Sequence, residues 1–162
     1  RLSIYLSLQK GKKYMKVKDF MIKNVCCVTP DTKISDAAKI MNENHIGSVP
    51  VCDNNNCICG ILTDRDIVLR GVACGKNVDS TPISDIMSCN VCSCDENENI
   101  EQAENKMSQN QIRRLPVCDE NNHVIGILTM GDLANNNEEI GMQDFCKTMS
   151  EVCNSNGNKN AE

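Results

Sequence analysis

Two threonine–aspartate pairs are the residues of this sequence best suited to bind a ligand. Thr63 and Asp66 follow one short apolar run, and Thr129 and Asp132 follow another. A hydroxyl and a carboxylate at the carboxyl end of a buried strand can accept hydrogen bonds from a ribose diol. The same residue types also suit the start of a helix, where a side-chain oxygen accepts a backbone N–H. The spacing leaves both interpretations open.

The pairs recur because the chain contains the same unit twice. Matched positions lie 66 residues apart without a gap, among them Asp19 and Asp85, Ala37 and Ala103, Pro50 and Pro116, Asp66 and Asp132. Two copies with so long a period indicate a duplicated supersecondary unit rather than a solenoid array. The identical register of the two pairs favours the ligand-binding interpretation more than one pair alone would.

Each copy has the pattern β-α-β-β-α. A β-type run (25–29, then 91–95) precedes capping residues and an apolar helix face, which are Asp31, Thr32, Ile34, Ala37, Ala38 and Met41 in the first copy and Asn97, Ile100, Ala103 and Met107 in the second. A proline-containing strand (48–52, then 115–118) and a polar turn of hairpin length follow. The third strand leads into the threonine–aspartate turn and a second helix, expected at 67–73 and at 133–136.

These patterns predict an α/β (α+β) fold with six segments. They are an N-terminal extension at 1–16 that we expect to be weakly ordered, a first repeat at 17–75, a linker at 76–82, a second repeat at 83–137, an amphipathic C-terminal helix at 138–153 and a disordered tail at 154–162. The C-terminal helix has apolar residues at helical spacing, and its other face is not basic. We therefore expect it to pack on the protein or on a partner subunit rather than on a membrane.

Composition argues against two classes of partner. The chain has 17 basic and 22 acidic residues, a net charge of −5, and aromatic residues make up only 2%. Neither a basic surface for phosphates nor aromatic platforms for bases are present, so we expect no nucleic-acid partner. No apolar run is long enough to cross a membrane, and the first residues lack the cleavage site of a secretory signal. We expect a cytoplasmic protein.

Several motifs together resemble a known family. The strands IGSVPVCD and RRLPVCDENN and the doubled turn GILTxxD are similar to those of a cystathionine-β-synthase (CBS) domain pair, or Bateman module. The resemblance covers residues 17–137, and it implies two repeats packed as a pseudo-two-fold pair. The stretch GILTDRDIVLRGVACGKNV further resembles small stand-alone bacterial CBS proteins of the hypoxic-response type.

The resemblance implies a function. Such modules bind adenosine ligands (AMP, ADP, ATP, S-adenosylmethionine or dinucleotides) in two clefts between the repeats, and they dimerise through their helices. They signal by conformational change to a regulated protein, which here is unknown. In the family the turn residues hold the ribose, which carries over to Thr63, Asp66, Thr129 and Asp132. A cation for phosphate often stands three residues before the strand proline.

At that last position the two copies differ. The second copy has Arg113, whose guanidinium can form a bidentate pair with a phosphate, whereas the first has Gly47, which offers only a backbone N–H. We therefore expect unequal phosphate recognition. Arg65, Arg70 and Arg114 could serve as other cations, but the sequence favours solvated surface charges.

Twelve cysteines raise the question of a metal or redox site. Cys52 and Cys118 occupy equivalent strand positions, as do Cys26 and Cys92, and a small apolar residue would serve equally well there, which favours buried thiols in a reducing compartment. Cys89, Cys92 and Cys94 are closely spaced, as are Cys57 and Cys59, but no second Cys-x-x-Cys follows at the spacing of a zinc ribbon. We expect no metal, and we keep Cys89, Cys92 and Cys94 as the alternative candidates.

Three functional hypotheses remain. The sequence lacks a nucleophile with an adjacent base, a carboxylate pair at catalytic spacing and a glycine-rich phosphate loop, so we do not expect an enzyme. A homodimeric sensor of an adenosine ligand is the leading hypothesis. The alternatives are a cysteine-based metal or redox sensor on the same scaffold and a ligand-free dimerisation module.

Overall fold

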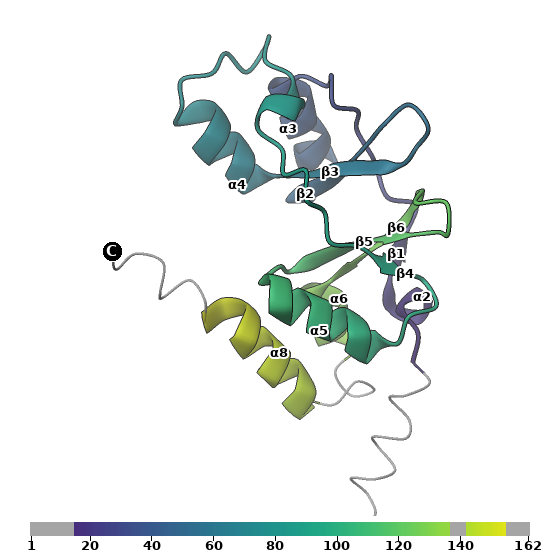
Figure 1. Cartoon of the computed structure of the whole chain (residues 1–162). Coiled ribbons are helices and arrows are strands. Elements are labelled where there is room, and N and C mark those ends of the chain that lie inside the picture. Colours follow the sequence, from purple (N-terminus) through teal and green to yellow (C-terminus); the bar gives the residue numbers. More distant parts are fainter. Residues whose placement is uncertain (1–14, 137–141, 155–162) are drawn as a thin grey trace, which may run out of the picture. The chain divides into compact units, whose positions relative to one another are not determined.

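The protein, seen in a computed structural model that describes residues 15–136 and 142–154, forms two compact units (Figure 1). The first-repeat unit consists of residues 24–91 and 120–124. The second-repeat unit consists of the described parts of 1–23, 92–119 and 125–162. Of the tail expected at 154–162, Asn154 is instead the last residue of α8, and 155–162 lie outside the described residues, as does most of the N-terminal extension. So do residues 138–141 of the expected C-terminal helix.

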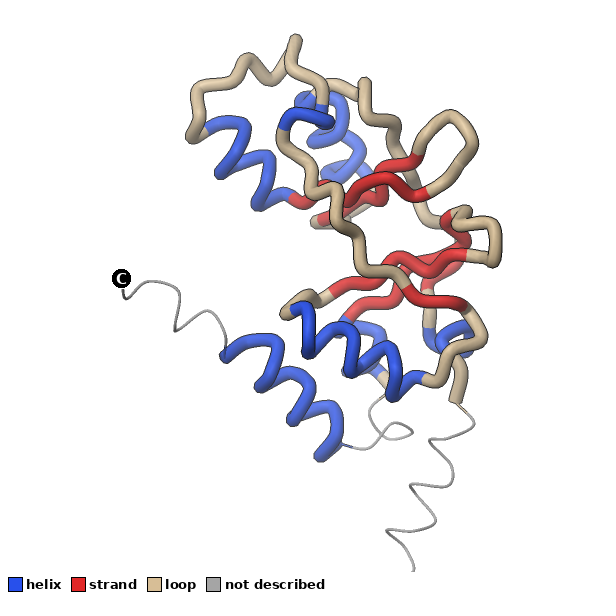
Figure 2. Tube along the Cα trace, in the orientation of Figure 1, coloured by secondary structure: helices blue, strands red, loops and turns tan. Residues whose placement is uncertain are grey.

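The second-repeat unit is built on a four-stranded sheet. The strands lie in the order β1-β6-β5-β4, with β1 antiparallel to β6 and β4 parallel to β5. The elements are α2 (Val17–Phe20), β1 (Ile22–Lys23), β4 (Cys94–Asp95), α5 (Ile100–Asn110), β5 (Arg114–Cys118), β6 (Val124–Thr129), α6 (Met130–Asn135) and α8 (Met142–Asn154). Figure 2 shows the strands of this unit gathered beside its helices.

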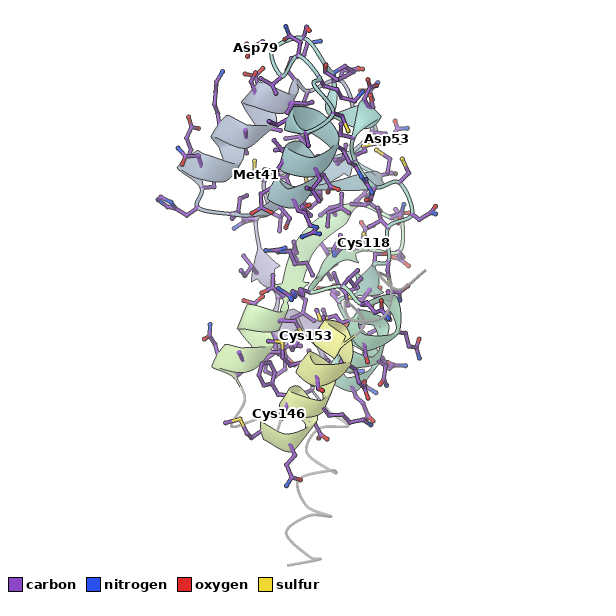
Figure 3. All side chains as sticks on the ribbon, turned by 90° about the vertical axis from the view of Figure 1, so that its left-hand side faces the viewer. Met41, Asp53, Asp79, Cys118, Cys146 and Cys153 are labelled. Carbon is purple, nitrogen blue, oxygen red and sulfur yellow. The ribbon has the colours of Figure 1, made fainter. Side chains whose placement is uncertain are left out.

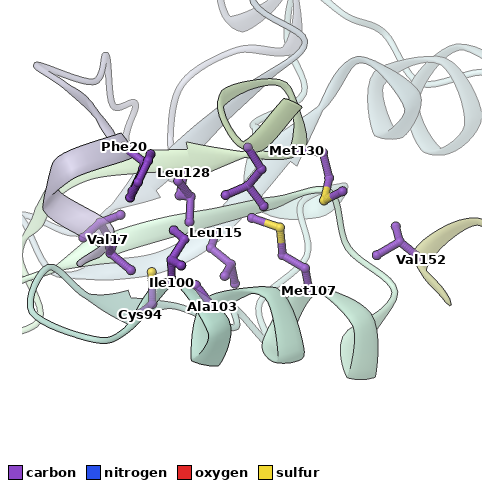
Figure 4. Close-up of a cluster of buried hydrophobic side chains, with 12 residues drawn as sticks. Val17, Phe20, Cys94, Ile100, Ala103, Met107, Leu115, Leu128, Met130 and Val152 are labelled. Atoms are coloured by element: carbon purple, nitrogen blue, oxygen red, sulfur yellow. The ribbon is translucent and has the colours of Figure 1, made fainter. Parts of the chain in front are cut away.

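An aliphatic cluster holds this unit together. Fully buried Ile100 and Met107 of α5 pack with Leu115 of β5, Leu128 of β6 and Leu133 of α6 (Figure 4). Burying side chains of this kind stabilises a fold by roughly 1.5–3 kcal/mol each. The cluster contains one aromatic ring, which agrees with the low aromatic content.

Helix α8 packs on the same cluster. Its Val152 is buried, and Phe145 and Met149 are half-buried against the cluster. The side chain of Ser108 on α5 donates to the carboxylate of Glu151 on α8. Of the two expected partners of the C-terminal helix, the protein itself and a partner subunit, the helix therefore packs on the protein from Met142 onward.

The first-repeat unit has a similar order of helices and strands, but its sheet has two strands instead of four. Its elements are α3 (Ile34–Glu43), β2 (Ser48–Cys52), β3 (Ile58–Thr63), α4 (Asp64–Asp66), the π-helical segment η1 (Ile67–Val72) and the 3₁₀ turn η2 (Ile83–Asp85). β2 and β3 are antiparallel, and single bridges extend the pair on both sides, from Val28 to Val51 and from Ser88 to Ile61. Its core includes Ile34, Leu62 and Ile86.

Several predicted element boundaries were wrong. The strand expected at 25–29 is reduced to the bridge at Val28, and that at 91–95 to β4. The N-caps are Lys33 and Asn99, not Asp31, Thr32 or Asn97. The reason is local: Thr32 accepts the Thr29 N–H, and the Asn97 N–H donates to Asp95, so both form turns ahead of the helices.

The two helices that follow the turns also begin earlier than expected. Instead of 133–136, the second-copy helix is α6, which starts directly after Thr129. Instead of one helix at 67–73, the first copy has α4 followed by η1, in which the Ala73 N–H donates to Val68 O at 2.9 Å. This bond spans five residues and widens the helix into a π segment.

Each unit completes its sheet with a segment that precedes the other repeat's first strand. β1 pairs with β6, with Ile22 opposite Ile127. At the matching place in the first-repeat unit, Ser88 and Ile61 exchange both backbone hydrogen bonds, at 2.9 and 3.0 Å. The compact units therefore do not coincide with the contiguous repeats 17–75 and 83–137.

This exchange explains the glycine of the doubled GILT motif. A Cβ at Gly126 would lie 2.8 Å from Met21 Sδ and 3.0 Å from Ile22 O. A Cβ at Gly60 would lie 2.7 Å from Met87 Sδ and 3.3 Å from Ser88 O. Both glycines are needed because the exchanged segment crosses closely over the third strand.

We predict that Gly126→Ala destabilises the protein by about 1–3 kcal/mol, because the new methyl group meets a backbone oxygen that cannot move aside. Gly60→Ala should cost less, since the backbone oxygen nearest to its Cβ, Ser88 O, lies at 3.3 Å, whereas Ile22 O lies at 3.0 Å from the Cβ at Gly126. Chemical denaturation measures both. Gly131→Ala, whose Cβ meets nothing closer than 3.4 Å, is the control. Equal stability of Gly126→Ala and this control would contradict the explanation.

Candidate functional site

The first threonine–aspartate turn is closed by reciprocal hydrogen bonds. Thr63 is the N-cap of α4, and its Oγ1 accepts the Asp66 N–H at 3.2 Å. Asp66 Oδ2 accepts from the Thr63 N–H at 3.0 Å and from the Thr63 hydroxyl at 2.6 Å. This is a capping box, and it satisfies two backbone donors that the helix start would otherwise leave unpaired.

The second turn repeats this geometry. Thr129 Oγ1 accepts the Asp132 N–H at 3.2 Å, and Asp132 Oδ2 accepts from the Thr129 N–H and hydroxyl at 2.8 and 2.6 Å. The helix-start interpretation of the pairs is therefore confirmed. It uses one carboxylate oxygen in each turn, so the other oxygen, Oδ1, can still accept a ligand hydroxyl.

The two remaining carboxylate oxygens have different surroundings. Asp66 Oδ1 lies 3.3 Å from Arg70 Nη1. Within the described part of the chain, Asp132 Oδ1 has neither a cation nor a hydrogen-bond donor against it. The two turns therefore have the same sequence motif, but in the described residues only the aspartate of the first turn has a cation beside it.

The structure brings Gly47 and Arg113 to equivalent places beside the turns. Gly47 O accepts the Asp64 N–H at 3.2 Å, and Arg113 O accepts the Met130 N–H at 2.9 Å. In each case the donor is the residue directly after the turn threonine. The residue three before the strand proline is thus tied by its backbone to the turn of its own repeat.

The side chain of Arg113 points to α8. Its Nη2 lies 3.7 Å from Cys153 Sγ, which in turn lies 3.8 Å from Met149 Sδ. Figure 3 shows Cys153 on α8. A weak N–H···S contact holds the guanidinium, so a phosphate could replace it at little cost.

Arg70 has a contact that was not expected from the sequence. Its side chain is 53% exposed, as expected of a surface charge, but its Nη1 also lies 3.3 Å from the carboxylate of the turn residue Asp66. The signal was present in the sequence, because Asp66 and Arg70 stand at i and i+4 on a helix. Within the described residues, neither Arg65 nor Arg114 forms a side-chain hydrogen bond or ion pair with a turn threonine or aspartate.

The cysteines do not assemble into a metal centre in the described part of the chain. All twelve are thiols, and no group of three or more Cys, His, Asp or Glu there is arranged to hold a metal ion. Cys89, Cys92 and Cys94 therefore do not form such a group. Burial raises the pKa of the Cys94 thiol to about 12. Burial also raises the pKa values of Cys27 and Cys59.

Comparison with known sequences identifies similar proteins. Residues 17–72 and 83–139 match the CBS domain family. The CBS domain-containing protein YhcV of Bacillus subtilis is 43% identical over 128 residues, which are 77% of this chain and 89% of YhcV. Hypoxic response protein 1 of Mycobacterium tuberculosis is 33% identical over 132 residues, 82% of this chain and 92% of that protein.

Solved structures similar to this chain include some with bound metal ions or adenosine-containing ligands. Hypoxic Response Protein I, crystallised with two coordinated zinc ions, matches with a TM-score of 0.69, 33% identity and coverage of 75% of this chain and 98% of that one. The CBS domain pair of MJ0100, in complex with 5-methylthioadenosine and S-adenosyl-L-methionine, has a TM-score of 0.68, 30% identity and coverage of 76% and 95%. CBSX2 in complex with AMP has a TM-score of 0.67, 28% identity and coverage of 78% and 98%.

No helix in the described ranges is long and apolar enough to cross a bilayer.

The cysteine environments predict a graded chemical reactivity. With a pKa of about 12, Cys94 is almost wholly protonated at pH 8, whereas alkylating reagents attack the thiolate. We expect iodoacetamide to modify exposed Cys89 in the folded protein, and Cys94 only after unfolding. Peptide mass spectrometry after timed alkylation measures both rates. Similar rates at the two cysteines in the folded protein would contradict the assigned environment of Cys94.

Proposed function

We propose that this chain, which belongs to the CBS domain family, is a regulatory protein that binds adenosine ligands at its two threonine–aspartate turns. The candidates are AMP, ADP, ATP and S-adenosylmethionine. Relatives of this chain have been crystallised with AMP and with S-adenosyl-L-methionine, which supports the ligand class. The observation that carries the proposal is the doubled turn, in which the cap uses one carboxylate oxygen of each aspartate and does not use the other.

The chemistry of the turn suits a ribose. Thr63 and Thr129 fix Oδ2 of their aspartates, so each carboxylate is oriented before a ligand arrives. A carboxylate oxygen accepts more than one hydrogen bond, and a ribose offers two adjacent hydroxyl donors. Pre-orientation reduces the entropy lost on binding. The helix cap and the ligand contact are thus two uses of one side chain.

Phosphate recognition is expected to depend on Arg113. Its backbone is tied to the second turn, and among the described residues the Cys153 thiol is the one hydrogen-bond partner of its guanidinium. A phosphate oxygen is a far stronger acceptor than a thiol. Gly47 stands in the matching place of the first repeat and can give at most its backbone N–H. The proposed contact residues are therefore Thr63, Asp66, Thr129, Asp132, Arg113 and Gly47.

We further propose that the protein is a cytoplasmic homodimer without catalytic activity that signals to a regulated protein. The segment η1 exposes three apolar side chains, Val68, Leu69 and Val72, each at least 47% exposed. Such a surface is typical of an interface with another chain. The twelve thiols are consistent with a reducing compartment.

Ligand-dependent melting tests the proposed function. We expect adenosine, AMP or ATP at saturating concentration to raise the melting temperature of the folded protein, because each binds only the native state. A metal or redox sensor would respond instead to chelators or oxidants. A ligand-free dimerisation module would respond to neither group of reagents, and that result would refute the proposal.

Loss of a turn carboxylate should weaken binding. We predict that Asp132→Ala lowers AMP affinity at the second turn by about 1.5–3 kcal/mol, because the ribose hydroxyls lose a charged acceptor. Asp66→Ala should act in the same way at the first turn. Calorimetric titration measures both variants.

Matched controls separate binding from folding. Two other aspartates also accept backbone N–H groups: Asp95 accepts from Asn97, and Asp53 accepts from Asn55 and Cys57. Neither aspartate is a proposed ligand contact. Asp95→Ala and Asp53→Ala should lose stability without losing affinity. Parent-like affinity of both Asp132→Ala and Asp66→Ala would show that the ribose assignment is wrong.

The role of Arg113 predicts a difference between ligands. Arg113→Ala should weaken ATP and AMP binding at the second turn and leave adenosine nearly unchanged. Arg113→Lys should weaken phosphate binding less, because it keeps the charge and loses only the planar fork. Titration of the three ligands against the parent and both variants tests this. Equal losses for adenosine and ATP would mean that Arg113 supports the fold instead.

The oligomeric state is a separate prediction. Light scattering at micromolar concentration should give twice the mass of one chain. Val72→Glu should shift the mass toward the monomer, because it places a charge in the exposed apolar surface of η1. Glu43→Gln on the neighbouring helix α3 serves as the control. A monomeric parent would refute the homodimer.

A further inference from the structure

We infer that Arg70 makes the first turn selective for anionic adenosine ligands over neutral ones. The inference rests on the proposed function of the turns and goes beyond it, because it assigns a specificity-determining residue to the repeat that lacks a counterpart of Arg113. Three observations carry it: the contacts of Arg70, its unoccupied donors, and the residue that replaces it in the second repeat.

Arg70 is anchored beside the turn through a single nitrogen. Its Nη1 donates to Ile86 O at 3.0 Å and to Ser88 Oγ at 3.2 Å, and it lies 3.3 Å from Asp66 Oδ1. An exposed ion pair alone would fix the side chain weakly. The two additional acceptors hold the guanidinium in one place, so its charge is fixed beside the carboxylate that is proposed to hold the ribose.

The other edge of the guanidinium remains available. Within the described residues, no acceptor lies against Nε or Nη2 of Arg70, and the side chain is 53% exposed. The Nε–Nη2 edge presents two parallel N–H donors, the geometry that binds a phosphate or carboxylate in bidentate fashion. Anchoring on Nη1 therefore leaves a pre-oriented anion-binding edge.

In the described part of the second repeat, no such group lies beside the turn carboxylate. The position that matches Arg70 is Asn136, whose Nδ2 donates to the backbone oxygen of Asp132 at 2.7 Å and not to its carboxylate. The charge at this position is therefore specific to the first turn. The two repeats thus place their cations differently, with Arg70 after the first turn and Arg113 before the second.

The electrostatic consequence has opposite signs for the two kinds of ligand. Arg70 withdraws charge from Asp66 Oδ1, which makes that oxygen a weaker acceptor for the hydroxyls of a neutral nucleoside. For a nucleotide, the free edge of Arg70 adds a charge-assisted hydrogen bond to the phosphate. Arg70 therefore raises the preference of the first turn for a nucleotide over adenosine.

The test isolates the first turn by using Asp132→Ala as the background. In this background we expect Arg70→Asn, which installs the residue of the second repeat, to weaken AMP binding about five-fold, a value reduced for solvent exposure. Adenosine affinity should stay within about two-fold of the background or increase. Arg70→Lys should lie between, because it retains charge without the fork. Calorimetry with AMP and adenosine gives both constants.

Two control variants separate this role from others. Lys39→Gln removes a cation of the same unit that forms an ion pair with Asp36 and, within the described residues, with no turn carboxylate, so it should leave the ratio of AMP to adenosine affinity unchanged. Ser88→Ala removes one anchor of Arg70 without changing the charge, and it should reduce the ratio less than Arg70→Asn does.

The outcomes distinguish three possible roles of Arg70. A lower ratio of AMP to adenosine affinity in Arg70→Asn supports the inference. Equal losses for both ligands would show that Arg70 only supports the fold, and an unchanged ratio would show that it is a solvated surface charge; either overturns the inference alone. Failure of the parent and the Asp132→Ala background to bind either ligand would overturn the proposed function and the inference with it.

Discussion

The reciprocal hydrogen bonds between threonine and aspartate are the interaction on which both halves of the molecule depend. In each copy they end the third strand, start the following helix and orient one carboxylate. Because the cap occupies only Oδ2, the same aspartate can stabilise the fold and still accept a ligand. The structural and functional interpretations of the turn are therefore compatible, and a variant must be judged on stability and binding separately.

Much of the fold could be predicted from local patterns. The apolar periodicity of Ile100, Ala103 and Met107 places α5 correctly, and the doubled GILT run places β3 and β6. What local patterns cannot show is which segments pair over long distances. Only the structure shows that β1 pairs with the third strand of the second repeat and that the Ser88 segment pairs with the third strand of the first. The sequence did contain a signal of this close approach, because Gly60 and Gly126 leave room for the pairing segments.

The candidate site could likewise be predicted from the sequence only in part. The turn residues and the equivalence of Gly47 and Arg113 follow from register, since a constant offset maps one repeat onto the other. The surroundings of Arg70 and Arg113 do not follow from the repeat register. Arg70 is held by Ile86 and Ser88 in one unit, and Arg113 contacts Cys153 of α8 in the other. Differences between the two turns arise from these neighbours, outside the repeated motif.

The central claim is that each threonine–aspartate turn contributes one adenosine site. The most direct measurement is the number of AMP molecules bound per chain, counted by native mass spectrometry at the lowest ligand concentration that fills the sites of the parent. The account predicts two for the parent, one for Asp66→Ala, one for Asp132→Ala and none for the double variant. An equal number bound to the parent and to the folded double variant would contradict it.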